Sequence, residues 1–175
     1  ELTIQRVNNR AYEEQTMEKS PAEYLSADQW RHVAMVAGTN FVKLYVNGAL
    51  VATENSRNNW KPTPAPLLKN FLGRSVVKEA GNNPDFNGQM AEIRLWAGER
   101  TAKEIRTHIP NRLTGREPGL LALWNFADGT ARDASPNGRD GTLGGGARVT
   151  EATLPIASTL GPWSRLVGRI TDANG

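Results

Sequence analysis

Apolar and polar residues alternate along most of this chain with a period of two. That period places apolar side chains on one face of a β-strand. It is clearest in the five segments 30–37, 41–46, 49–53, 89–96 and 120–126. Residues that favour turns separate such segments at intervals of about 8–12 residues, which is typical of an all-β sandwich.

Two Asn-Gly pairs mark turns between or before these strands. Asn47-Gly48 lies between two apolar runs and predicts a two-residue hairpin, because both central residues of a type I′ turn need positive φ. Asn87-Gly88 leads into the segment 89–96. Within each strand we expect every second residue to contribute to the core, and these are Val33, Met35, Leu44, Val46, Ile93, Leu95, Leu121 and Leu123.

A short helix is predicted directly after the strand that ends at Trp96. Thr101 and Glu104 have the spacing of a capping box, in which each side chain accepts a hydrogen bond from the other residue's backbone N–H group. The helix should end near Ile109, because Pro110 disfavours helical geometry in the preceding residue.

Composition excludes several kinds of function. The chain has 175 residues and no cysteine, so structural disulfides, thiolate metal sites and cysteine nucleophiles are excluded. The net charge is +3, but no block of five like charges occurs, and we expect no binding to nucleic acid. No apolar run approaches the roughly 18 residues of a membrane span, so we expect no membrane insertion.

Several phrases resemble, in their order and spacing, the laminin G-like members of the concanavalin A-like superfamily. They are W-R-H-V-A at 30–34, L-Y-V-N-G at 44–48, F-N-G-Q-M-A-E-I-R-L-W at 86–96, R-T-A-K-E-I at 100–105, L-T-G-R-E-P-G-L-L-A-L-W-N-F at 113–126 and D-A-S-P-N-G-R-D-G-T-L at 133–143. The resemblance implies an antiparallel two-sheet jelly-roll sandwich with one short helix. Members usually have more strands before the first of these phrases, so we expect residues 1–153 to form a domain that lacks its first strands.

The end of the chain carries a second, shorter resemblance. Residues 166–175, L-V-G-R-I-T-D-A-N-G, are similar to the opening strand and turn of a carboxypeptidase regulatory-like β-sandwich module. We therefore expect a linker at 154–164 and the first strand of a following module at 165–175. The chain is then a fragment of a larger multidomain protein.

Enzymatic activity is not expected. The superfamily includes glucanases, and retaining glycosidases need two carboxylates about 5–5.5 Å apart. The glucanase pattern E-x-D-x-x-E does not occur in this chain. Glu92 is alone on its expected strand, and Arg94 two residues later is typical of a surface ion pair.

The acidic turns after residue 127 are the candidate metal site. Asp133, Ser135, Asn137 and Gly138 match the first half of an EF-hand loop, but Gly144 occupies the position of the required glutamate. Asp128, Asp133 and Asp140 could still supply single oxygens, and the family resemblance implies one calcium ion at a loop rim. The alternative is that these aspartates bond backbone amides of their own turns.

A ligand surface is expected in two polar loops. Trp60 lies in a proline-rich loop and offers an aromatic platform for a sugar, and Asn82, Asn83 and Asp85 could complete a polar rim. The resemblance and the missing carboxylate pair imply a non-catalytic ligand-recognition module of a secreted or surface bacterial-type protein, extracellular or in the cell envelope. Its partners would be a glycan or an extracellular protein, and neighbouring domains of the same chain. The alternatives are a structural spacer without a ligand and a domain of a carbohydrate-active enzyme.

Overall fold

The computed structural model describes residues 28–55, 70–74 and 85–154, residue 24, and the backbone of strands at 2–7, 12–17 and 163–169. The chain divides into two compact units, which we describe separately. Unit 1 comprises Glu1–Leu68 and Gly98–Pro110, and unit 2 comprises Lys69–Ala97 and Asn111–Gly175. The helices within the described ranges include none long and apolar enough to cross a membrane.

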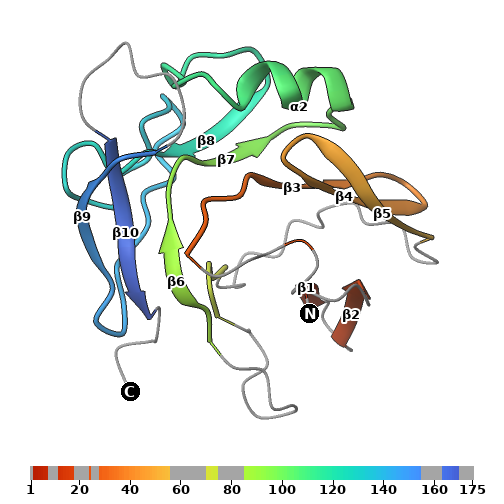
Figure 1. Ribbon diagram of the computed structural model, residues 1–175, viewed down its shortest axis with the longest axis horizontal. Helices are drawn as coiled ribbons and strands as arrows, with labels where there is room; N and C mark the ends of the chain where they lie inside the picture. Colours follow the sequence, from red (N-terminus) through yellow and green to blue (C-terminus); the bar gives the residue numbers. More distant parts are fainter. Residues whose placement is uncertain are drawn as a thin grey trace. The chain divides into compact units, whose positions relative to one another are not determined.

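The described part of unit 1 forms two antiparallel sheets and a short helix. Its elements are β1 (Leu2–Val7), β2 (Tyr12–Met17), β3 (Val33–Ala37), β4 (Phe41–Val46), β5 (Ala49–Asn55) and α2 (Ala102–His108). β1 pairs with β2, and β4 lies between β3 and β5 in a three-stranded sheet (Figure 1). β3, β4, β5 and α2 agree with the strands and the helix expected at 30–37, 41–46, 49–53 and after Thr101.

The turn between β4 and β5 has the expected geometry. Asn47 has a φ of 49° and Gly48 a φ of 77°, so the predicted positive values are confirmed. The Asn47 side chain also accepts a hydrogen bond from the backbone N–H of His32 at 3.0 Å. The turn therefore holds the start of β3 as well as the two strands that it joins.

Helix α2 begins with the predicted capping box. The N–H of Glu104 donates to the Thr101 hydroxyl at 3.2 Å, and the N–H of Thr101 donates to the Glu104 carboxylate at 2.8 Å. The Thr101 hydrogen bonds, with help from Arg100, lower the pKa of Glu104 to about 2. The last residue of the helix is His108, and Ile109 is its C-cap.

The core of unit 1 uses both faces of β4. Val42 and Leu44 pack with Ala52 in one cluster. Tyr45 packs with Val36 and with Ile105 of α2 in the other. The two clusters explain why β4 is the most buried strand of its sheet.

The described residues of unit 2 also form two antiparallel sheets. Its strands are β6 (Asn87–Met90), β7 (Ile93–Trp96), β8 (Leu120–Trp124), β9 (Arg148–Ala152) and β10 (Trp163–Arg169). β7 pairs with β8, and β10 lies between β6 and β9 (Figure 1). With the short helix α2, these strands agree with the expected all-β, jelly-roll-like class.

β10 lies in the part of the chain where we expected a linker at 154–164 and the first strand of a following module at 165–175. One edge of β10 pairs with β6, with Leu166 opposite Met90, and the other edge pairs with β9, with Trp163 opposite Ala152. The expected boundaries at residues 153 and 164 remain predictions.

The predicted strand 89–96 is broken in two. Glu92 has a φ of 51°, so β6 ends before it, and β7 begins after it in a different sheet. The break changes which side chains of β7 face inward. Leu95, expected in the core, is 47% exposed, whereas Trp96 of the opposite parity packs against the cluster around Leu123.

The rest of the predicted core is partly correct. Leu44, Val46 and Leu123 are buried. Met35 is half-buried and packs against the cluster of Val42. Val33, at the start of β3, is 39% exposed.

We predict that an alanine at position 48 destabilises the chain more than one at position 98. Gly48 and Gly98 both have positive φ, which costs an L-residue about 1–2 kcal/mol. A Cβ at Gly48 would also overlap the Arg106 side chain, whereas a Cβ at Gly98 meets nothing within 4 Å. Urea unfolding of Gly48→Ala and Gly98→Ala measures the difference, and equal losses would contradict the packing of Arg106 on the turn.

A second pair of variants tests the burial of β7 and β8. Leu123 is fully buried, so Leu123→Ala should reduce the free energy of unfolding by about 2–5 kcal/mol. Leu95 is exposed, so Leu95→Ala should change it by only about 0.5 kcal/mol. Denaturant titration of both variants checks this. A larger loss at Leu95 would show that Leu95 faces the core, as the alternation of the sequence predicted.

Candidate functional site

The carboxylate of Asp133 holds the loop after β8 against that strand. Asp133 is only 3% exposed. Its Oδ1 accepts hydrogen bonds from the N–H groups of Leu123 at 2.9 Å and Ser135 at 2.8 Å. Its Oδ2 accepts from the N–H of Arg139 and the hydroxyl of Ser135, both at 2.9 Å. One carboxylate thus accepts hydrogen bonds from three backbone amides and a hydroxyl.

These hydrogen bonds also determine the charge of Asp133. Burial acts to raise its pKa, but the N–H groups of Leu123, Arg139 and Ser135 together outweigh burial, and the pKa is lowered. Hydrogen bonds to the charged form favour ionisation. Asp133 is therefore an anion that local hydrogen-bond donors stabilise.

Side chains of the same loop cover the rest of this edge of β8. The carbonyl of Leu121 accepts hydrogen bonds from Asn137 Nδ2 at 3.0 Å and from Arg139 Nη1 at 2.8 Å. The N–H of Ala134 donates to the carbonyl of Leu123 at 2.8 Å. The edge of β8 that faces away from β7 is thus paired without another strand, which removes a site of edge-to-edge association. We call these contacts of residues 133–139 with β8 the Asp133 clasp.

A hollow of about 380 Å³ opens beside the Asp133 clasp. Its lining comes from three pieces of unit 2 and comprises Arg116, Asn125, Ala127, Asp128, Arg132, Asp133, Ala134, Ser135 and Pro136. Among the described residues, the carboxylates of this lining are Asp128 and Asp133. Hydrogen bonds from the Thr130 hydroxyl and N–H lower the pKa of Asp128, so both carboxylates are ionised at neutral pH.

The turn that carries Arg116 is fixed by Glu117 and Gly115. The carboxylate of Glu117 accepts from the N–H of Thr114 at 2.7 Å and from the N–H of Gly115 at 3.0 Å. Gly115 has a φ of 89°, and a Cβ there would overlap the carbonyl oxygen of Ala134. Glycine thus allows this turn to lie directly against the Asp133 clasp.

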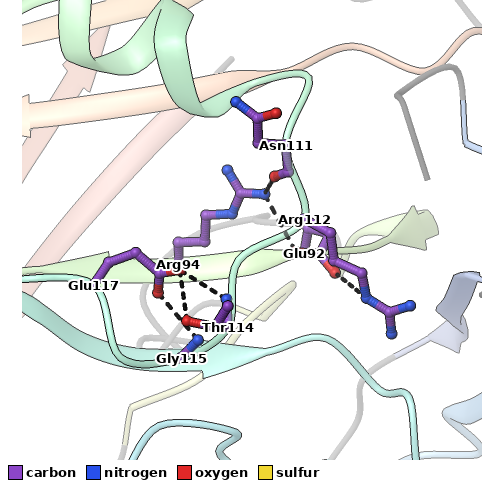
Figure 2. A network of polar contacts seen from close by, with 7 residues as sticks. All are labelled: Glu92, Arg94, Asn111, Arg112, Thr114, Gly115 and Glu117. Atoms are coloured by element: carbon purple, nitrogen blue, oxygen red, sulfur yellow. Dashed lines mark hydrogen bonds and ion pairs between the residues drawn. The ribbon is translucent and has the colours of Figure 1, made fainter. Parts of the chain in front are cut away.

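Glu92 is at the centre of a buried polar network next to this turn (Figure 2). Its Oε2 lies 3.2 Å from Arg94 Nη2, and its Oε1 lies 4.0 Å from Arg112 Nε. Arg94 also donates to the carbonyl of Asn111 at 2.7 Å. The side chains of Glu92, Arg94 and Arg112 are 7%, 9% and 8% exposed, so the expected surface ion pair is instead buried.

Burial raises the pKa of Glu92, and the lowering effects of Arg94 and Arg112 do not fully compensate. Glu117 is close enough to add to the rise. A carboxyl with a raised pKa beside an ionised one is the pattern of an acid–base pair. However, Glu92 does not line the hollow, and three donors already occupy the carboxylate of Glu117.

The predicted calcium ligands make hydrogen bonds to the protein itself. Asp128 Oδ1 accepts from the N–H of Thr130 at 2.9 Å, and Asp140 Oδ1 accepts from the N–H of Asp133 at 2.9 Å. Throughout the described ranges, no group of three or more histidine or acidic side chains is placed to hold a metal ion. N–H groups directed at a carboxylate take the place of a cation. Asp128 and Asp133 therefore fit the Asx-turn alternative, whereas Asp140 bonds an amide seven residues earlier. Calcium binding remains a prediction.

The predicted ligand surface falls mostly outside the described residues. Trp60, Asn82 and Asn83 lie there, so their role remains a prediction. Asp85 is described and half-buried. Sequence reasoning missed Arg116 and Arg132, because nothing in the local sequence indicates that two positions 16 residues apart line one hollow.

Comparison with known proteins gives two matches. The model of the concanavalin A-like lectin/glucanases superfamily, of the laminin G type, matches residues 2–106. Pappalysin-1 of Mus musculus is 33% identical over 111 residues, which cover 62% of this chain and 6% of pappalysin-1. The chain thus corresponds to a small part of that relative. No solved structure matches, and nothing supports the resemblance to a carboxypeptidase regulatory-like module.

We predict that Asp133→Ala destabilises the chain strongly. The variant leaves three backbone N–H groups without their acceptor, and each such buried group costs about 1–3 kcal/mol. The expected loss is about 3 kcal/mol or more. Asp128→Ala is the matched control, with an expected loss below about 1 kcal/mol because Asp128 is exposed. Thermal melting with and without millimolar calcium completes the test, since a calcium shift abolished by Asp133→Ala would favour the metal site.

A pH series tests the buried state of Glu92. Its folded-state pKa is raised above the ordinary 4.5, so its favourable contribution is complete below pH 4.5 and is lost as the pH rises through the folded pKa. The unfolding free energy of the native chain, minus that of Glu92→Gln, should therefore fall as the pH rises above 4.5. Urea titrations on both sides of that pH measure it. Parallel profiles would contradict the raised pKa.

Proposed function

The chain belongs to the concanavalin A-like lectin/glucanase superfamily, and we propose that it is a non-catalytic recognition module of a larger extracellular protein. Its ligand is a glycan or another extracellular protein. The observation that carries this proposal is the polar hollow of unit 2, which the Asp133 clasp and the turn of Glu117 hold in place. Loops fixed on a rigid scaffold are where binding surfaces commonly lie.

The state of the carboxylates supports a non-catalytic role. Glycoside hydrolysis needs one carboxylic acid that donates a proton and a second, ionised carboxylate nearby. Asp128 and Asp133 line the hollow, and both have a lowered pKa, so neither holds a proton to donate at neutral pH. Glu92 has a raised pKa but is buried between two arginines.

Family membership supports a place in a multidomain protein outside the cell. The matched segment makes up 6% of pappalysin-1, so a domain of this kind occurs there within a much longer chain. A cysteine-free sequence also suits a domain whose sheets, rather than disulfides, provide its stability. We retain Trp60, Asn82, Asn83 and Asp85 as a second proposed contact surface for the same ligand.

The experiment is a binding screen of the intact chain on an array of neutral and acidic glycans, with a parallel assay for hydrolysis of each glycan that binds. We expect saturable binding without release of product. Trp60→Ala should weaken binding if the proline-rich loop contributes. Trp96→Ala is not a suitable control, because Trp96 packs in the core. Hydrolysis of a bound glycan would overturn the non-catalytic proposal, and no binding to glycans or to extracellular proteins would favour a structural spacer.

A further inference from the structure

Arg116 and Arg132 differ from the other arginines around the hollow. Arg94 and Arg112 are buried beside Glu92, and Arg139 donates to the carbonyl of Leu121. Arg116 and Arg132 are exposed, and neither guanidinium forms a hydrogen bond or ion pair within the described part of the chain. Two cationic groups at one hollow are thus available to a ligand.

The backbone fixes where these two side chains start. The N–H of Arg116 donates to the Thr114 hydroxyl at 3.3 Å, and the N–H of Arg132 donates to the Thr130 hydroxyl at 3.2 Å. Arg116 follows Gly115, which lies against Ala134, and Arg132 precedes the buried Asp133. The two arginines therefore reach the hollow from two chain segments that lie in direct contact.

The free donors and acceptors around the hollow suit an anion that also carries hydroxyl groups. Four donors already occupy the carboxylate of Asp133, so the groups left to bond a ligand are the two guanidiniums, Asp128 and Asn125. A guanidinium binds a carboxylate through two parallel hydrogen bonds. Asp128 and Asn125 add carboxylate and amide groups that can bond to hydroxyls.

Size and lining favour a small sugar over a peptide. The hollow of about 380 Å³ lies at the small end of the range for ligand pockets, about 300–1,000 Å³. Its lining contains no aromatic side chain among the residues that the structure describes, so recognition there depends on charge and hydrogen bonds rather than on stacking. An extended peptide would need a longer groove.

We propose that this hollow binds the carboxylate of an acidic sugar unit, with Arg116 and Arg132 as the carboxylate-binding residues and Asp128 and Asn125 contacting its hydroxyl groups. The inference rests on the proposed recognition function and names the class of ligand for one site. It predicts preference for a uronic acid over the matching neutral sugar, and weaker binding at high salt.

The test compares glucuronic acid with glucose by calorimetric or NMR titration of the intact chain. We expect glucuronic acid to bind at least about tenfold more tightly, as the loss of one charge-assisted hydrogen bond would give. The double variant Arg116→Gln with Arg132→Gln should remove this preference. Arg148→Gln, an exposed arginine of β9 that does not line the hollow, is the control and should bind as the native chain does.

Four results would overturn the inference. Equal binding of glucuronic acid and glucose would remove the carboxylate preference, and unchanged binding by the double variant would place the ligand elsewhere. Succinate, which has carboxylates but no hydroxyls, should bind more weakly than glucuronic acid, and equal binding would indicate an acidic peptide instead. Melting curves check that the variants fold. Binding of acidic glycans on the array that is unchanged in the double variant would overturn this site while leaving the proposed recognition function standing.

Discussion

The arrangement of residues 113–139 depends on one buried carboxylate. Asp133 lies at the contact between β8 and the loop that follows it, and its four hydrogen bonds join the Leu123 amide of the strand to the Ser135 and Arg139 amides of the loop. Burying a charge is unfavourable unless donors replace the lost water. Here backbone amides are those donors, so the loop must adopt one conformation for the carboxylate to be satisfied.

The hollow is a consequence of that conformation. Once the loop is fixed, the carbonyl of Ala134 faces a turn that only a glycine at position 115 can bring so close. Glu117 holds the same turn from its other side, and the buried pair of Glu92 and Arg94 lies next to it. Arg116 and Arg132 thus belong to a connected set of polar contacts, although neither takes part in it through its guanidinium.

Features determined by a few neighbouring residues could be predicted from the sequence. The Asn47-Gly48 turn and the Thr101–Glu104 capping box each depend on groups within four residues, and both have the expected geometry. The parity of β7 could not be predicted, because alternation assumes a continuous extended backbone. Glu92 interrupts it with a positive φ that is uncommon for a glutamate and has no recognisable sequence signal.

The candidate site was predictable only in part for the same reason. The phrase D-A-S-P-N-G-R suggested Asp133 either as a metal ligand or as the acceptor of an Asx-turn, and the hydrogen bond from the N–H of Ser135 fits the second. It could not identify the partner, because the Leu123 amide is ten residues away and belongs to a strand. Arg116 and Arg132 line one hollow because Gly115 lies against Ala134, and these two residues are still farther apart in the sequence.

Closing a sheet edge and changing the bound ligand often conflict in binding domains. At the covered edge of β8 the two depend on different residues. Residues 133–139 supply the hydrogen bonds that close this edge, while Asn125, Asp128 and Arg132 line the hollow without bonding to the strand. Substitutions in the second group can therefore change the ligand without reopening the sheet. Over evolution, a single loop of this kind can acquire new specificities while the residues that keep two molecules from joining edge to edge stay the same.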